Sequence, residues 1–479
     1  MRTAQGLLRV MAASCTLLLA ACSGGVSQAP AGAAHSGEAP SHPAPEQAVA
    51  TPAPQQIVTG LGVNANVHSW NNGQLRPAID KIAELGDVTW RVIIEKADWG
   101  SRTELAESSV IDASRNAGIY ERGKMADLWN TIAYINSKPG QQVMVNVMGS
   151  VPEWMGGNHI DPASEDQWVR MIASMVAYGR TVRHVDFTLL GPMNETDWNG
   201  VEGPQVQPDQ YARILHKLLV QLDELGLSDI RLVGPDTASA SRATSDYLPA
   251  LAADSLVMGK MAHFGIHSYD GSSAGAMEAL KRATDPGMDF WVTEFAGPCP
   301  GCDTGPPPLR DWSVAAGMAE HAIALLSQGA AGLLQYDAWD GYYEHHGSTG
   351  YWGLLAYDSS SGLYLPRKSY YVLKQLIRYT PRGAVRIPAS STNGEVDVVA
   401  VQDPASGRLT IFGQNTSDSA VPVTLRLPGV GAAVRLDSFV TDSGRNMEAD
   451  GSAILTDGTM TMTAGPQSVF TLTGVAAQG

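Results

Sequence analysis

The sequence predicts an α/β fold, a (β/α)8 barrel followed by a C-terminal antiparallel β-sandwich. From residue 57 onward, short β-rich runs alternate eight times with amphipathic helical patterns, as they do in a parallel barrel. After about residue 384 the helical patterns stop, and β-branched runs follow one another across turn signals such as Asn393-Gly394. Such spacing is typical of a small sandwich. We therefore expect a barrel over residues 57–383 and a sandwich over residues 384–479.

The predicted barrel strands are short, and several are nearly apolar throughout. Val143–Val147 is an example, and such runs are typical of strands buried on both faces of a parallel sheet. An open doubly wound sheet is the competing fold, but no Gly-x-Gly-x-x-Gly turn follows the first strand. The strands are predicted at Leu61–Asn66, Thr89–Ile94, Gln142–Met148, Asp186–Leu190, Arg231–Gly234, Phe264–His267, Phe290–Thr293 and Gly332–Tyr336.

Apolar residues at helical spacing lie between these strands, and period-two patterns follow them. The helices are predicted at Leu75–Leu85, Met125–Ser137, Gln167–Tyr178, Pro208–Leu225, Ala274–Arg282, Trp312–Ser327 and Arg367–Tyr379. The sandwich strands are predicted at Val396–Val401, Arg408–Phe412, Val421–Leu427, Ala433–Val440 and Ser468–Thr473.

The first 56 residues are interpreted as targeting and tethering segments. Residues 1–21 have a basic start, a short apolar run and small residues before Cys22, which is typical of a secretory signal. Leu19–Cys22 resembles a bacterial lipobox, which implies a lipid on Cys22; an ordinary cleaved signal is the alternative. Residues 22–56 are rich in Ala, Pro, Ser and Gly, so we expect a disordered tether. We expect an exported lipoprotein at the cell surface or on the periplasmic face of the outer membrane.

Two of the four cysteines remain once the signal and the lipid are allotted. Cys299 and Cys302 form a Cys-Pro-Gly-Cys motif, and a local disulfide is the default in an oxidising compartment. A thioredoxin-like redox role is the alternative, but it requires the motif at a helix start in a small βαβ domain.

Charge excludes one class of partner. The chain has 479 residues and a formal charge of -16, with 32 basic against 48 acidic residues. Nucleic-acid-binding proteins need a basic footprint, so we expect no nucleic acid. We expect a monomer that contacts the membrane through its lipid anchor alone.

The residues that follow each strand are the candidates for chemistry, because barrel active sites lie at the carboxyl ends of the strands. Glu195 follows the fourth predicted strand and Glu294 follows the seventh, so the two carboxyl groups are expected to converge at the barrel mouth. Side chains suited to sugar faces and hydroxyl groups accompany the other strands. They are Arg91, Trp154, Asn194, His267, Tyr269 and Trp339.

These residues resemble the active-site motifs of clan A glycoside hydrolases, and the resemblance covers the chain from about residue 57 to its end. Asn194-Glu195 resembles the acid/base motif of the clan, and Glu294 resembles its nucleophile. His267-Ser268-Tyr269 is similar to the strand-six motif whose tyrosine contacts the nucleophile.

Two further positions match the clan. Arg91 matches its strand-two arginine, and Trp339 resembles the sugar platform after strand eight. Trp154 lies at a rim position, where a second platform is expected. His267 either orients its neighbours or takes a direct part.

Glycoside hydrolase family 30 is the nearest resemblance, because it joins this barrel to a C-terminal β-sandwich. Pro366–Tyr371 resembles the last barrel helix of that family, and Tyr379–Ala384 resembles its entry into the sandwich. The chain departs from the family at Asn194-Glu195-Thr196, where Asn-Glu-Pro is common. Little folded sequence precedes the first strand, where the family has an N-terminal sandwich strand.

The resemblance implies a retaining glycoside hydrolase that cleaves β-glycosidic bonds. Glu294 would attack the anomeric carbon while Glu195 protonates the leaving oxygen, with the carboxyl groups about 5–5.5 Å apart. Arg91 and Tyr269 would stabilise the charge of Glu294, and Asn194 would bind the sugar 2-hydroxyl group.

Alternatives remain at this stage. A carbohydrate-binding lipoprotein without turnover and a transglycosylase with the same residues are the two rivals. The substrate is an oligosaccharide or polysaccharide, and β-1,6-glucan, xylan and galactan all stay open, as does endo against exo action. Glu344-His345-His346 could suggest a metal, but the chemistry of the clan needs none, so we expect no metal and no other cofactor.

Overall fold

The computed structural model describes residues 56–67, 73–95, 117–283, 288–431 and 433–475. The predicted signal, the predicted lipidation site Cys22 and all but the last residue of the predicted tether lie outside the described residues. Within those residues, no helix is both long enough and apolar enough to cross a bilayer.

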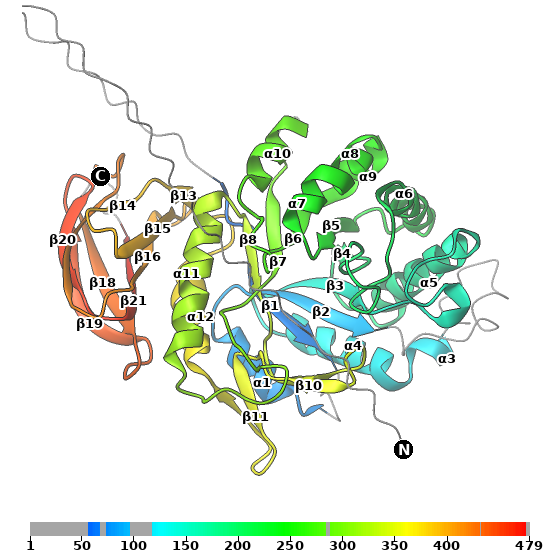
Figure 1. Ribbon diagram of the computed structural model, residues 1–479, viewed down its shortest axis with the longest axis horizontal. Helices are drawn as coiled ribbons and strands as arrows, with labels where there is room; N and C mark the ends of the chain where they lie inside the picture. The colour runs from blue at the N-terminus through cyan, green and yellow to red at the C-terminus, as the bar shows by residue number, and fades with distance from the viewer. Residues whose placement is uncertain (1–55, 68–72, 96–116, 284–287, 432, 476–479) are drawn as a thin grey trace, which may run out of the picture. The chain divides into compact units, whose positions relative to one another are not determined.

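Eight parallel strands close into a barrel in chain order, and β1 pairs with β8 to complete it. Val63 lies opposite Trp90 in the β1–β2 register and opposite Gln335 in the β1–β8 register. The barrel strands (Figure 1) are β1 (Gly60–Asn66), β2 (Thr89–Glu95), β3 (Gln142–Met148), β4 (Leu189–Gly191), β5 (Arg231–Thr237), β6 (Met261–His267), β7 (Phe290–Phe295) and β8 (Gly332–Gln335).

Amphipathic helices cover the outside of the barrel. In α6, Pro208 occupies the first turn, and the helix buries Tyr211, Leu215 and Leu222 on one face. The longer helices are α1 (Arg76–Ala83), α4 (Gly123–Asn136), α5 (Glu165–Ala177), α6 (Pro208–Glu224), α10 (Ala276–Ala283), α11 (Trp312–Gln328) and α12 (Lys368–Ile377). The shorter ones are α3 (Ala117–Tyr120), α7 (Ala240–Arg242), α8 (Leu248–Ala252) and α9 (Ser255–Lys260).

The predicted barrel is confirmed, with differences at its edges. The fourth strand was expected at Asp186–Leu190 and is the three-residue Leu189–Gly191. The short helices α7 to α9 have too few turns for a clear periodic pattern, and the sequence did not predict them.

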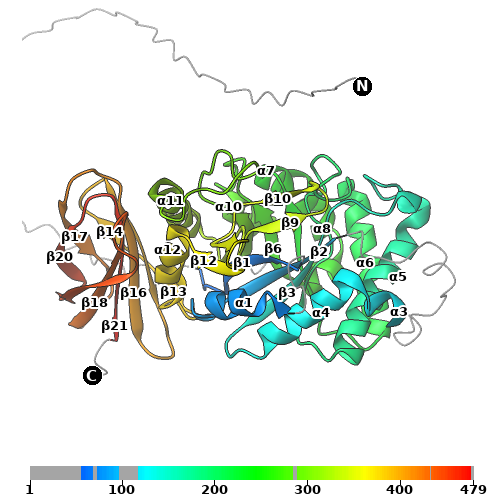
Figure 2. The same ribbon diagram turned by 90° about the horizontal axis from the view of Figure 1, so that it is seen from below.

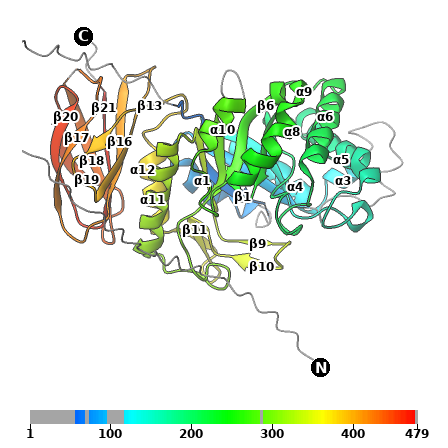
Figure 3. The same cartoon turned by 45° about the horizontal axis from the view of Figure 1, so that its top comes forward.

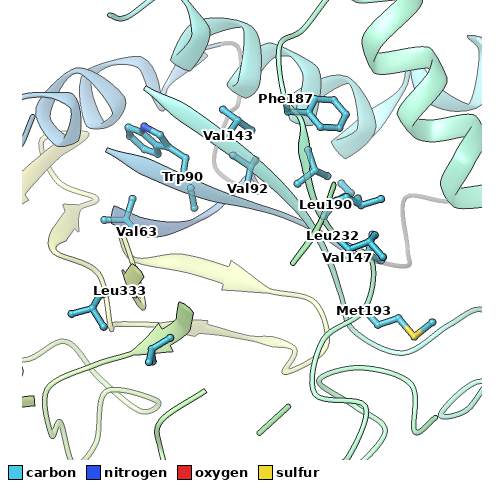
Figure 4. Close-up of a cluster of buried hydrophobic side chains, with 14 of the residues drawn as sticks. Val63, Trp90, Val92, Val143, Val147, Phe187, Leu190, Met193, Leu232 and Leu333 are labelled. Carbon is cyan, nitrogen blue, oxygen red and sulfur yellow. The ribbon is translucent and has the colours of Figure 1, made fainter. Parts of the chain in front are cut away.

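Outward-facing strand side chains pack against the helices in one large apolar core. Figure 4 shows part of it, where Val63, Trp90 and Val92 lie near Val143 and Leu232. All five are buried.

The inside of the barrel has two layers of different character. Met144, Leu189, Val233, Trp291 and Leu334 form a small separate apolar cluster. Two positions further along β3 and β7 the residues are polar, Asn146 and Thr293. They belong to a second, polar layer that lies nearer the carboxyl ends of the strands. Its buried members are Asn64, Arg91, Asn146, Asp236 and Thr293.

The C-terminal sandwich consists of a six-stranded sheet in the order β13-β15-β16-β21-β18-β19 and a three-stranded sheet in the order β14-β17-β20. The sequence missed β19, whose side chains are almost all exposed and therefore show no alternation. The strands are β13 (Val385–Ile387), β14 (Ser390–Ser391), β15 (Val396–Gln402), β16 (Arg408–Asn415), β17 (Val421–Arg426), β18 (Val434–Thr441), β19 (Glu448–Leu455), β20 (Thr459–Ala464) and β21 (Ser468–Val475).

Helices α11 and α12 lie between the barrel strands and the sandwich (Figures 1 and 2). The Gln375 amide of α12 donates to the carbonyl oxygen of Val469 at 3.3 Å, and Gln414 donates to the carbonyl oxygen of Ala316 in α11 at 3.1 Å. Val399 and Phe412 of the sandwich belong to the apolar core of the barrel. The two parts therefore share one core.

The long segment after β8 folds into two hairpins, which the sequence did not predict. They are β9 (Gly341–Tyr343) with β10 (Ser348–Gly350), and β11 (Leu355–Asp358) with β12 (Leu363–Pro366), and β9, β10 and β11 are labelled in Figure 3. The loop after β7 reaches this segment. It contains the Cys299–Cys302 disulfide, and the backbone of Tyr351 donates to the carbonyl oxygen of Cys302 at 2.9 Å.

Candidate active site

Glu195 is held by its backbone at the mouth of the barrel. It lies four residues after β4 with a left-handed φ of 39°, and its N–H donates to the carbonyl oxygen of Asp236 at 2.8 Å. Gly203 makes this path possible, because a Cβ there would lie 1.5 Å from the carbonyl oxygen of Asn194. The Glu195 residue is only 8% exposed, so its carboxyl group is largely shielded from solvent.

Glu294 projects from β7 into the same space. A register shift in the β7–β8 pairing between Val292 and Phe295 breaks the strand alternation. Thr293 and Glu294 consequently both contact residues inside the barrel. Arg91 donates from Nη1 to Glu294 Oε1 at 2.5 Å, and the Tyr269 hydroxyl group donates to Oε2 at 3.3 Å.

His267, at the end of β6, lies between the two glutamates. Its Nδ1 is 2.8 Å from Glu195 Oε1, and its Nε2 is 3.5 Å from Glu294 Oε1. Burial opposes its protonation, but the charges of Glu294 and Glu195 outweigh that effect and raise the pKa of His267. One ligand atom each of Glu195, His267 and Glu294 lies within 4.8 Å of the others.

Arg91 organises the polar layer beneath the two glutamates. The fully buried guanidinium also donates to Asn64 Oδ1 at 2.7 Å, to Asn194 Oδ1 at 2.6 Å and to Asp236 Oδ2 at 3.3 Å. Burial opposes its charge, yet the charges of Asp236 and Glu294 outweigh burial and raise the pKa of Arg91. Arg91 is therefore a fixed positive charge that holds Glu294 and Asn194 in place.

Asp236 is the buried carboxylate that sequence reasoning missed. It accepts hydrogen bonds from Thr293 at 2.7 Å and from Asn146 at 3.3 Å in addition to Arg91. Gly265 leaves room for it, since a Cβ there would lie 2.2 Å from Asp236 Oδ1. The detectable signal was polar residues inside otherwise apolar strands, such as Asn146 in β3.

Burial changes the acid–base character of two neighbouring groups. Burial, reinforced by the nearby Glu294, raises the pKa of the Tyr269 hydroxyl group well above its usual value. Burial likewise raises the pKa of Asp337 well above its usual range, against a hydrogen bond from the Ala338 backbone. Tyr269 is thus a neutral donor to Glu294, although the residue as a whole is 50% exposed.

The two tryptophans expected as sugar platforms have different surroundings. Trp339 is 0% exposed, packs against Trp90 and donates from Nε1 to the carbonyl oxygen of Asn66 at 3.1 Å. A fully buried ring cannot stack on a sugar, so the platform prediction for Trp339 is wrong. Trp154 is partly buried against the core, and its role stays a prediction. Trp198, which the sequence analysis did not single out, is 57% exposed three residues after Glu195.

A second cluster of carboxylate and imidazole groups lies beside the site. His345 Nδ1 is 3.0 Å from Glu95 Oε2 and its Nε2 is 2.8 Å from Glu202 Oε2, while His346 Nε2 is 3.4 Å from Glu202 Oε1. Burial opposes the charge of His345, but Glu202 and Glu95 outweigh it and raise the pKa of His345 to about 9. Glu344 is not part of this cluster and pairs with Lys124.

The second cluster is joined to the first through the backbone. The carbonyl oxygen of Glu202 accepts a hydrogen bond from Asn194 Nδ2 at 3.0 Å. Asn194 is therefore fixed on both sides, by Arg91 at Oδ1 and by Glu202 at Nδ2. Within the described residues, two groups have ligand atoms close enough together to hold a metal ion: Glu195, His267 and Glu294, and Glu202, His345 and His346.

Comparisons with known proteins agree with this architecture. Residues 124–309 match the family model described as glycosyl hydrolase catalytic core. No curated protein matches the chain.

Solved structures share the whole fold. A glycoside hydrolase family 30 subfamily 8 xylanase from Clostridium acetobutylicum superposes with a TM-score of 0.69 at 18% identity, covering 88% of this chain and 98% of that one. A family 30 endoxylanase from Clostridium papyrosolvens gives 0.66 at 19% identity, over 89% and 98%. An endo-β-1,6-glucanase gives 0.65 at 15% identity, over 89% and 93%.

The structural likenesses show that the chain has the fold of family 30 enzymes, the (β/α)8 barrel with a C-terminal sandwich. Together with the match to the catalytic-core model, they support a glycoside hydrolase.

Proposed function

We propose that the protein is a retaining glycoside hydrolase that cleaves β-glycosidic bonds by double displacement. The observation that carries the proposal is the pairing of Glu195 and Glu294 across the barrel mouth. An oxygen of each lies within 4.8 Å of the other. A short separation favours direct attack by one carboxylate, because inverting enzymes keep the carboxyl groups about 6.5–9.5 Å apart to admit a water.

The surroundings of the two glutamates suit different roles. Glu294 accepts hydrogen bonds from Arg91 and from the Tyr269 hydroxyl group, which hold its carboxylate in position for attack on the anomeric carbon. In this step the glycosidic bond breaks, the leaving oxygen takes the proton of Glu195, and a covalent glycosyl–Glu294 ester forms. Glu195, now a carboxylate, removes a proton from water as the water oxygen bonds to the anomeric carbon and the ester bond to Glu294 breaks, which releases the sugar with its original configuration.

Other residues are proposed to hold the sugar. The Nδ2 group of Asn194 carries two hydrogens and donates one of them to the carbonyl oxygen of Glu202. The second hydrogen is proposed to bind the 2-hydroxyl group of the sugar. Trp198 lies three residues after Glu195, and Tyr269 donates to Glu294. Both residues are exposed and offer aromatic faces for stacking. Trp154 is a further candidate.

The substrate is proposed to be a β-linked glycan, and its identity stays open. The solved structures with this fold include xylanases and an endo-β-1,6-glucanase, so β-xylan and β-1,6-glucan are the first polymers to try. A transglycosylase would use the same carboxylate pair, and a sugar acceptor would take the place of water. A binding protein without turnover would not need Glu195 and Glu294 arranged as a pair.

Product stereochemistry tests the mechanism directly. The purified protein is screened on β-glycans and aryl β-glycosides, and the anomeric signals of the first product are followed by NMR at early time. We expect the β-anomer first, and an activated fluorosugar should label Glu294. An initial α-anomer would refute the retaining mechanism. Absence of turnover on every β-glycoside would favour the binding protein.

A further inference from the structure

We propose that Glu202, His345 and His346 form a binding site for a divalent transition-metal ion, with zinc as the expected occupant, next to Asn194. Nothing in the proposed glycosidase chemistry uses these three side chains. They come from two segments 143 residues apart in the chain, the loop after β4 and the turn between β9 and β10.

The identity of the donors favours zinc over magnesium or calcium. Two imidazole nitrogens and a carboxylate are donors that zinc prefers, whereas magnesium and calcium take oxygen ligands. This donor set leaves a fourth position for water.

The geometry is close to that of a three-ligand zinc site. Ligand atoms 2.0–2.1 Å from a tetrahedral ion lie about 3.3–3.5 Å from one another. The His345 Nε2–Glu202 Oε2 distance is 2.8 Å, the His346 Nε2–Glu202 Oε1 distance is 3.4 Å, and one ligand atom of each residue lies within 4.8 Å of the others. Small side-chain rotations would admit an ion.

Buried polar atoms provide independent support. The His345 side chain is 3% exposed. Both of its ring nitrogens are close to carboxylate oxygens, yet neither makes an aligned hydrogen bond. Misaligned contacts give each nitrogen less than an aligned hydrogen bond would, and coordination of Nε2 would replace one of them.

The two principal ligands are held in place by their backbones. The N–H of His345 donates to Glu95 Oε2 at 3.0 Å, and the carbonyl oxygen of Glu202 accepts from the N–H of Gly149 at 2.8 Å. Glu95 also lies 3.0 Å from His345 Nδ1. A carboxylate beside the non-ligating nitrogen orients metal-binding histidines in many zinc sites. His346 is 47% exposed on its side chain, which provides a path for the ion.

Metal binding is measured on the untagged chain after chelation and dialysis. Zinc content is determined by mass spectrometry and affinity by competition with a chromophoric chelator. We expect one zinc per chain with a dissociation constant at or below about 1 μM, weaker than closed four-ligand sites. His346→Ala should weaken binding at least about 100-fold, and Glu95→Gln about 10–100-fold.

His159→Ala is the matched control, because His159 is an exposed histidine beside a carboxylate, that of Asp161, and lies outside the cluster. It should bind zinc as the wild type does. X-ray absorption at the zinc edge should show two imidazole nitrogens and carboxylate oxygen at about 2.0–2.1 Å.

Three results would overturn the proposal. The first is a wild type without zinc above background, which would leave His345 as a protonated bridge between two acids. The second is unchanged affinity in His346→Ala. The third is loss of zinc in His267→Gln with His346→Ala unaffected, which would place the ion between Glu195 and Glu294. None of these results depends on glycosidase activity.

Discussion

His267 Nδ1 lies 2.8 Å from Glu195 Oε1, which ties the last residue of β6 to the loop after β4. The other nitrogen of the same ring is 3.5 Å from Glu294. One buried imidazole therefore bridges the two carboxyl groups, and the charges of Glu294 and Glu195 raise its pKa against the effect of burial.

Substitution of His267 should change the pH profile as well as the rate. We expect His267→Ala to lower kcat/KM by about 100-fold, because a misplaced acid is a poor proton donor. The pH profile should change in both His267→Ala and His267→Gln, since each removes a titratable group whose pKa is raised by its place between the two glutamates. Gln should retain more activity than Ala because it can still donate to Glu195. Identical pH profiles for wild type and both variants would contradict this role.

Loss of Glu195 should be rescued by a small anion. On an activated aryl β-glycoside, Glu195→Ala should still form the glycosyl-enzyme, because the leaving group needs little protonation. Turnover should fall about 10²–10⁴-fold on unactivated glycans, and added azide should restore it on the aryl substrate as the β-glycosyl azide. Glu294→Ala should be inactive on every substrate. Glu153→Ala removes an exposed glutamate after β3 and should behave as wild type. Failure of azide to change the Glu195→Ala rate would count against the acid/base role.

Arg91 should matter for stability as much as for activity. Arg91→Met leaves the buried carboxylates of Asp236 and Glu294 without their cation, and we expect a loss of about 3–5 kcal/mol in the free energy of unfolding. Arg91→Met combined with Asp236→Asn should recover part of that loss. Arg435→Met, at a 75% exposed side chain, should change stability by less than about 0.5 kcal/mol. Urea denaturation measures the free energy of unfolding of each variant. An Arg91→Met protein as stable as the wild type would contradict the predicted role of Arg91 in stability.

Glu165 should contribute stability that is lost in acid. Arg213, together with Lys217 and Gln210, lowers the pKa of Glu165 to about 2. A depressed native pKa stabilises the fold above the unfolded value near 4.5, and this contribution disappears as the pH falls from 4.5 toward 2. At pH 7 we expect Glu165→Gln to cost about 1–2 kcal/mol, less than a fully buried pair because Arg213 and Lys217 retain water.

Thermal unfolding from pH 7 to pH 2.5 measures the difference in stability between the wild type and Glu165→Gln. This stability difference should shrink steadily below pH 4.5. Asp166→Asn is the control, because its 70% exposed side chain pairs with the same Lys217, and it should have little effect at any pH. A pH-independent loss in Glu165→Gln would show that packing, not charge, is responsible.

Cys22 is proposed to anchor the exported protein through a lipid. In a suitable bacterium the wild type should partition with membranes and detergent, and Cys22→Ser should not be processed to the lipidated form. Mass spectrometry of the mature N-terminus is the measurement. A wild type that is exported, soluble and unmodified would contradict lipidation and favour the alternative, an ordinary cleaved signal peptide.

The barrel could be predicted because alternation of strand and helix is a local pattern. The same reasoning located Glu195, Glu294 and Arg91, since the carboxyl end of each strand is defined by the strand itself. The orientation of a side chain beyond that end depends on the loop that follows. Trp339 lies four residues after β8, yet it is buried in the core and packs against Trp90.

Contacts between distant loops could not be predicted in the same way. Glu202 and His345 meet because the segment after β8 folds into a hairpin, and nothing in the local pattern of either segment indicates the other. Asp236 was missed for a related reason. It sits inside a strand, and its partners Arg91 and Thr293 come from strands that are far away in sequence.

The shared core of barrel and sandwich means that the catalytic half of this chain is not a detachable module. Cutting near residue 384 would remove β15 and β16 from α11, and β18 and β21 from α12. It would also take Val399 and Phe412 out of the shared core and leave the buried amide of Gln375 without Val469. Grafting the barrel onto another protein, or exchanging its sandwich for a binding module, would require redesign of those two helices. Evolution of substrate choice in this architecture is therefore expected to proceed through the loops around the cleft, with the sandwich inherited as part of the enzyme.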